Sequence, residues 1–150
     1  MTYKEKIEMA KRSNITINYD LLERDNVVGI YKFFKVKGDV RYCFYIGKAT
    51  DVAFRLLGAS KGHIYMYLKE NYSKLVPLEM KNALEDGYKI EVEIEEKDYK
   101  DTCFSKAAHR LALAEIQEIV KYQELGQCLL QKPEGVGKKE EDFWERNYNE

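Results

Sequence analysis

Two strand-like segments joined by a glycine turn constrain the fold of this chain more than any other feature. The first runs from Val27 to Lys37 and the second from Val40 to Ile46, and both are rich in β-branched and aromatic residues. The dipeptide Gly38-Asp39 separates them, and a two-residue connection that contains glycine is typical of an antiparallel hairpin. We therefore expect a β-hairpin at the centre of the fold.

The rest of the sequence predicts helices and one further strand. Residues 88–96, YKIEVEIEE, alternate apolar and acidic side chains, which indicates a strand with one solvated face. Helices are expected over a charged segment that ends near Asn14, and over residues 52–57, 64–72, 78–85 and 104–124, with residues 15–26 as a connection. The order α-β-β-α-α-β-α predicts an α+β fold, in which helices flank a small antiparallel three-stranded sheet.

The composition excludes several classes of protein. The chain has 150 residues, of which 45% are hydrophobic and 34% charged, as in soluble globular domains. No apolar run approaches the roughly 20 residues that a membrane span needs, and no signal peptide opens the chain. Cys43, Cys103 and Cys128 are widely spaced and form no CxxC pair, which argues against a disulfide framework or a zinc site. We expect a cytoplasmic protein without a membrane partner.

Charge is unevenly distributed along the chain. The formal net charge is −1, but residues 29–63 contain seven lysines and arginines against two aspartates. Such a local excess suits a polyanionic partner, although solvated lysines on a hairpin would give the same pattern.

Two tyrosines of the expected hairpin can share a face of the sheet. Strict alternation places Tyr45 on the same face as Cys43 and opposite to Phe44. Tyr31 on the neighbouring strand can then lie beside Tyr45, either as an ordinary cross-strand aromatic pair or as part of a site.

One carboxylate interrupts the apolar stripe of the long helix. The stripe follows helical spacing and consists of Ala108, Ala112, Glu115, Ile119 and Tyr122. Burying an unpaired carboxylate is costly, so Glu115 needs a base, a hydrogen-bond donor or a metal as its partner. A salt bridge to a buried arginine would satisfy it equally well. Glu118 lies about 60° off the stripe and is expected to be solvated.

These residues resemble the GIY-YIG endonuclease superfamily. Gly29-Ile30-Tyr31 and Tyr45-Ile46-Gly47, on paired strands, spell its two signature tripeptides. The following GKATDVAFRL resembles the first helix of that family with its arginine at Arg55, and Glu115 resembles its metal-binding glutamate. The match covers about residues 27–130. Two features depart from the family: thirteen residues separate the tripeptides, slightly more than usual, and Gln127 stands where an asparagine is common.

The resemblance implies a GIY-YIG-like nuclease domain at 27–131, preceded by a helical extension (1–26) and followed by a tail (132–150). It implies a hydrolase that cuts phosphodiester bonds in DNA, with RNA the less expected substrate. One magnesium or manganese ion would be held by Glu115, whose remaining coordination sites water and phosphate oxygens fill.

The resemblance also implies roles for the other residues. Arg55 would bind the phosphate and stabilise its developing charge. Tyr31 would act as general base or orient the water, with Tyr45 beside it; a free tyrosine has a pKa of about 10, so neighbouring cations would have to lower it. Lys48, His63 and Gln127 are expected to contact the substrate, and His63 is either a second general base or simply a helix-start residue.

Three alternatives remain open at this point. A domain of the same fold could bind nucleic acid without cutting it, or the tripeptides could be accidental in an interaction protein. Asp86 and Glu95-Glu96-Lys97 also match the active-site pattern of a different class of nuclease, an acidic residue followed by a strand with the motif ExK. Glu95, however, continues the polar face of its strand and is better explained as solvated. A homodimer is compatible with the sequence.

Overall fold

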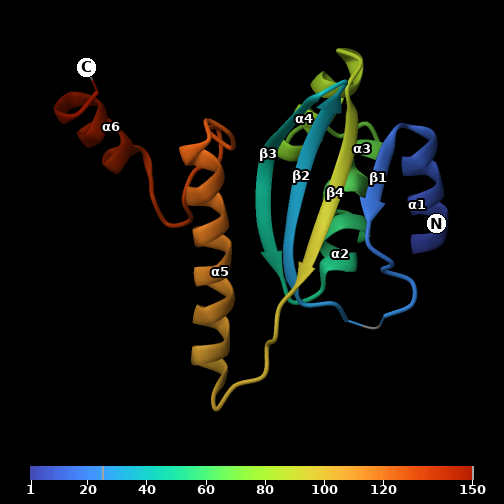
Figure 1. Ribbon diagram of the computed structural model, residues 1–150, viewed down its shortest axis with the longest axis horizontal. Coiled ribbons are helices and arrows are strands. Elements are labelled where there is room, and N and C mark those ends of the chain that lie inside the picture. The colour runs from blue at the N-terminus through green and yellow to red at the C-terminus, as the bar shows by residue number, and fades with distance from the viewer. Residues whose placement is uncertain (25, 150) are drawn as a thin grey trace.

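The computed structural model describes residues 1–24 and 26–149, in which four strands form one mixed sheet (Figure 1). The strands are β1 (Ile15–Asn18), β2 (Gly29–Lys37), β3 (Val40–Ala49) and β4 (Lys89–Glu96), in the order β1-β4-β2-β3. Strand β2 pairs antiparallel with both β3 and β4, whereas β1 pairs parallel with β4. The α+β class is confirmed.

The predicted three-stranded antiparallel sheet and the predicted order of elements are wrong. Residues 15–18, expected to be a connection, form the additional strand β1, which pairs with β4 from Ile15↔Ile90 to Asn18↔Glu93. Four residues are too few for a period-2 pattern to be distinctive, so this strand depends on a partner far away in the sequence.

Helices cover both faces of the sheet (Figure 1). They are α1 (Tyr3–Arg12), α2 (Val52–Leu57), α3 (His63–Leu68), α4 (Leu75–Glu85), α5 (Phe104–Glu124) and α6 (Lys138–Asn147). Helices α1 to α4 bury one face and α5 the other, whereas α6 stands apart beyond α5 and has no buried residue. Within the expected tail, α6 is therefore an element that the sequence analysis did not predict.

Successive residues of β2 divide between two hydrophobic cores. Tyr31 and Phe33 belong to the core beneath α1 to α4, whereas Ile30 and Phe34 belong to the core beneath α5. This division follows from the alternation of side chains along a strand. No helix in the described parts of the chain is long and apolar enough to span a membrane.

A β-bulge interrupts the same alternation in β3. Phe33 pairs with Tyr45 and Phe34 pairs with Cys43, so Phe44 is an extra residue between them. Phe44 and Tyr45 consequently both join the core beneath α1 to α4, whereas Cys43 joins the core beneath α5. The prediction that Tyr45 and Cys43 share a face is wrong for this reason.

Candidate functional site at the free edge of the sheet

The glycines of the two tripeptides are required by close packing. Tyr31 lies directly opposite Gly47, and a Cβ atom at position 47 would lie 2.2 Å from Cζ of Tyr31. A Cβ atom at Gly29 would lie 2.2 Å from the carbonyl oxygen of Glu95 on β4. Gly47 thus leaves room for the tyrosine ring, and Gly29 lets two strands approach each other.

Tyr31, Tyr45 and His63 form a cluster of stacked and tilted rings, which we call the ring cluster. The rings of Tyr31 and Tyr45 lie 6.3 Å apart at an interplanar angle of 29°, and the rings of Tyr45 and His63 lie 5.4 Å apart. The Tyr31 hydroxyl is 3.0 Å from Nε2 of His63, which is the first residue of α3. Tyr31 is only 1% exposed, so this hydrogen bond is shielded from water.

Burial controls the protonation of the ring cluster. Desolvation raises the pKa of Tyr31, and the charge of Arg55 opposes this only in part. Desolvation, reinforced by Arg55, lowers the pKa of His63 to about 3. At neutral pH, therefore, the phenol is protonated and the imidazole is neutral. A single proton lies between the Tyr31 hydroxyl oxygen and Nε2 of His63 in their hydrogen bond. The expectation that the site lowers the pKa of Tyr31 is therefore wrong: Arg55 acts in that direction, but burial raises the pKa overall.

Helix α2 places Arg55 beside the ring cluster. The Asp51 side chain accepts a hydrogen bond of 3.0 Å from the Phe54 amide and caps the helix. Arg55 follows one residue later, and its Nη1 donates to the carbonyl of Lys61 at 3.1 Å. Its charge also lowers the pKa of Tyr45, although burial raises that pKa overall.

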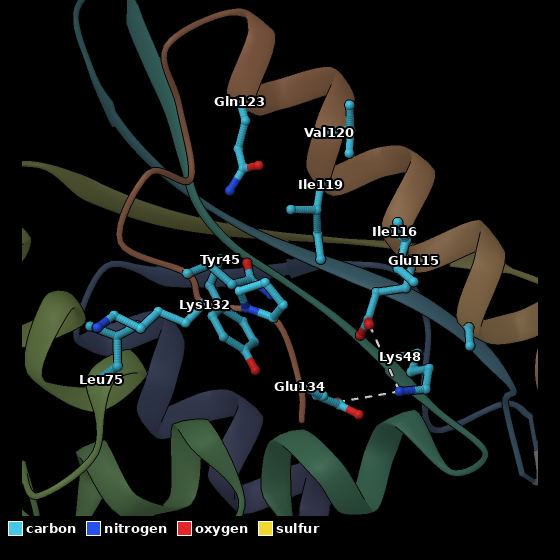
Figure 2. Close-up of a pocket in the computed structure, with 13 residues that line it drawn as sticks. Tyr45, Lys48, Leu75, Glu115, Ile116, Ile119, Val120, Gln123, Lys132 and Glu134 are labelled. Carbon is cyan, nitrogen blue, oxygen red and sulfur yellow. Dashed lines mark hydrogen bonds and ion pairs between the residues drawn. The ribbon is translucent and has the colours of Figure 1, made fainter. Parts of the chain in front are cut away.

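Glu115 of α5 forms an ion pair with Lys48 of β3, on the face of the sheet that α5 covers. The Glu115 side chain is 12% exposed, and its Oε1 lies 3.8 Å from Nζ of Lys48. Glu134, which follows α5, approaches the same ammonium at 3.3 Å, and Figure 2 shows both carboxylates pointing toward it. Burial raises the pKa of Glu115, whereas Lys48 opposes this shift. The predicted need for a partner is thus met by a lysine rather than by an arginine.

These groups line a cleft of about 390 Å³ along the free edge of β3 (Figure 2). Tyr45, Lys48 and Glu115 supply its polar groups, one wall is the apolar side of α5, and residues 131–134 border it. Tyr31, Arg55 and His63 do not line this cleft but adjoin it through Tyr45.

Two glutamines attach the segment after α5 to the free edge of β3. Oε1 of Gln127 accepts a hydrogen bond of 2.7 Å from the amide of Cys43. The Gln131 amide group accepts from the Ile46 N–H at 2.9 Å and donates to the Ile46 carbonyl at 2.5 Å. Gln127 was expected to contact the substrate but bonds to the backbone of β3. The sequence analysis did not identify Gln131, which makes the second attachment. The four-residue spacing of the two glutamines is the only sequence signal that could have found this attachment.

The basic residues of the hairpin do not form one surface. Lys32 is 11% exposed and lies 3.1 Å from Glu118, so the two form an ion pair between β2 and α5. Arg41 pairs with Glu93 on β4 at 2.6 Å. The expectation that Glu118 is solvated is therefore wrong, because its ion pair with Lys32 holds the Glu118 side chain against the sheet.

Glu115 is suited to hold a divalent ion as a single protein ligand. Within residues 1–24 and 26–149 no group of three or more histidine, cysteine, aspartate or glutamate side chains could hold a metal. A magnesium ion bound through one carboxylate needs room for water and phosphate oxygens, and Glu115 borders a cleft that offers such room.

Comparisons with known protein families, with curated proteins and with solved structures find no match to this chain.

Proposed function

We propose that this protein is a metal-dependent endonuclease of the GIY-YIG type that hydrolyses phosphodiester bonds in DNA. The observation that carries the proposal is the register of β2 and β3, in which Tyr31 lies over Gly47 and stacks against Tyr45. Arg55 and the Glu115–Lys48 pair flank this point from opposite faces of the sheet. Two accidental tripeptides would not account for the flanking groups.

In this proposal Lys48 binds the phosphate in the cleft, and Arg55, which lies beside the cleft at Tyr45, stabilises the charge that develops on it. Lys48 lines the cleft and is held there by carboxylates that an incoming phosphate can replace. Glu115 holds Mg²⁺ or Mn²⁺, which when bound supplies Lewis-acid stabilisation of the phosphate charge. Tyr45 lines the cleft and orients the attacking water, and the hydrogen-bonded Tyr31 and His63 pack behind its ring and hold it in place.

Cleavage assays with a matched glutamate control test this proposal. Plasmid, branched and single-stranded DNA, with RNA for comparison, are incubated with the protein in Mg²⁺, Mn²⁺ or EDTA. We expect wild type and Glu124→Gln, an exposed position on the same helix, to cut DNA only with metal, and Glu115→Gln to be inactive. Cutting in EDTA, or full activity of Glu115→Gln, would remove Glu115 from the metal site.

A domain that binds nucleic acid without cutting it is the second candidate. The burial of the Tyr31 hydroxyl and its absence from the cleft favour this function, because a base must reach the water that it activates. Retention of DNA in a binding assay, with no cleavage of any substrate in either metal, would support it over the nuclease.

A second copy of the chain is the protein partner that we propose. Leu113, Ile116 and Val120 form an exposed apolar stripe on α5, at 54%, 54% and 46% exposure, and the last two also line the cleft. Their spacing of three and four residues is typical of a helix–helix seam. Sedimentation analysis should detect a dimer that Leu113→Glu dissociates, since Leu113 lies in the stripe but does not line the cleft; a wild-type monomer would contradict the proposal.

A further inference from the structure

Two cysteines that are distant in sequence lie in contact in the core beneath α5. Cys43 belongs to β3, and Cys128 follows the end of α5 by four residues. Their Sγ atoms are 3.3 Å apart, and both side chains are buried, at 0% and 1% exposure. The Cys128 amide also donates a hydrogen bond of 3.0 Å to the Cys43 carbonyl, so the two backbones are held together. The third cysteine, Cys103, is exposed at the start of α5.

The two thiols are chemically unequal. Contact with Cys43 lowers the pKa of Cys128, and the nearby charge of Lys32 adds to this against the effect of burial. The same contact with Cys128, together with burial, raises the pKa of Cys43. A thiolate is the nucleophilic form of cysteine, so Cys128, whose pKa is the lower of the two, is the better nucleophile.

We propose that Cys43 and Cys128 form a reversible thiol–disulfide site. The sulfur of Cys128 attacks one oxygen of hydrogen peroxide and breaks the O–O bond, which yields a sulfenic acid and one water. The sulfur of Cys43 then displaces the hydroxyl group of that sulfenic acid, forming the S–S bond and a second water. Two thiols and one peroxide thus become one disulfide and two waters, and a dithiol reductant reverses the change.

The required movement is small because the backbones are already paired. The sulfur atoms must approach from 3.3 Å to about 2.05 Å, which side-chain rotation can supply. Access needs only a local opening of residues 127–131, a short segment at the sheet edge that hydrogen bonds to Cys43 and Ile46 hold in place. The bond would tie this segment to β3 immediately before residues 132–134, which border the cleft.

Peptide mapping of the full chain tests the site independently of any nuclease activity. Reduced native protein is treated with hydrogen peroxide, unfolded in N-ethylmaleimide and digested for mass spectrometry. We expect the Cys43 and Cys128 peptides to be joined and to separate again in dithiothreitol. The exposed Cys103 serves as the internal control for simple surface oxidation. Alkylation of both Cys43 and Cys128 while Cys103 is oxidised would overturn the proposal, as would a disulfide that joins either of them to Cys103.

A trapping experiment tests the order of the two steps. In Cys43→Ser the sulfenic acid of Cys128 has no thiol to resolve it, so dimedone should label Cys128. In Cys128→Ser, dimedone should leave Cys43 unlabelled. Equal labelling of the two variants would overturn the assignment of Cys128 as nucleophile, and if either variant fails to fold, the wild-type peptide map decides whether the site exists.

Discussion

Replacing Tyr31 with phenylalanine removes one buried oxygen and leaves the packing of the ring in place. Because that hydroxyl lies 3.0 Å from Nε2 of His63 in a site closed to water, its loss leaves a buried nitrogen without this partner. A buried polar group left unsatisfied costs about 1–3 kcal/mol, so the free energy of unfolding should fall by that amount. Tyr148→Phe, at an exposed position, should change it by less than about 0.5 kcal/mol.

A double-mutant cycle with His63→Leu isolates the hydrogen bond itself. Urea denaturation followed by circular dichroism should give a coupling free energy of about 1 kcal/mol between the two positions, since the double variant loses both polar partners together. If Tyr31→Phe is as stable as wild type and the two changes are additive, the hydrogen bond does not stabilise the fold and the reasoning fails. If Tyr31 acts as the general base of cleavage, as the family resemblance implies, Tyr31→Phe should slow single-turnover cleavage by roughly 10²–10⁴-fold, whereas Tyr148→Phe should not.

The pH dependence of stability gives a separate test of His63. Its pKa is lowered from 6.5 to about 3 in the folded protein, so between these values the unfolded chain binds more protons than the native state. Stability should therefore fall as the pH drops from 6.5 toward 3, by roughly 5 kcal/mol at most. His63→Leu should show a flatter profile over this range, and an unchanged profile would contradict the burial of a neutral imidazole.

Three further changes test the packing and the charges around the site. Burial raises the pKa of Glu115, so its ionised form destabilises the fold; Glu115→Gln should raise Tm at pH 7, with no difference below about pH 4. Gly47→Ala introduces a Cβ atom 2.2 Å from the Tyr31 ring and should lower the free energy of unfolding by about 1–3 kcal/mol; a smaller change would mean that the ring has room to move. Lys32→Met leaves the partly buried Glu118 with only the more distant Lys121, at 3.9 Å, and should lower the free energy of unfolding by about 1–3 kcal/mol. A second change, Glu118→Met, should restore most of this loss in chemical denaturation; equal losses in the single and double variants would refute the pairing.

The sequence alone determined the elements whose signals are local. The hairpin of β2 and β3 is encoded by two β-rich segments around Gly38, and β4 by strict alternation of apolar and acidic residues. Helix α5 has the expected bounds, and the Asp51 cap of α2 is likewise a local feature, because it joins residues only three positions apart. The need of Glu115 for a partner also followed from the sequence, since it depends only on helical spacing and on the cost of burying charge.

The tertiary structure alone decided which groups meet. Strand β1 exists because β4 pairs with it across more than seventy residues. The direction of the Tyr45 side chain depends on a bulge that appears only when β3 is aligned with β2. The bond from Tyr31 to His63 and the contact of Cys43 with Cys128 join residues 32 and 85 positions apart. Local propensity cannot encode such contacts, because their free energy arises only when the packed cores bring both partners together and exclude water from them.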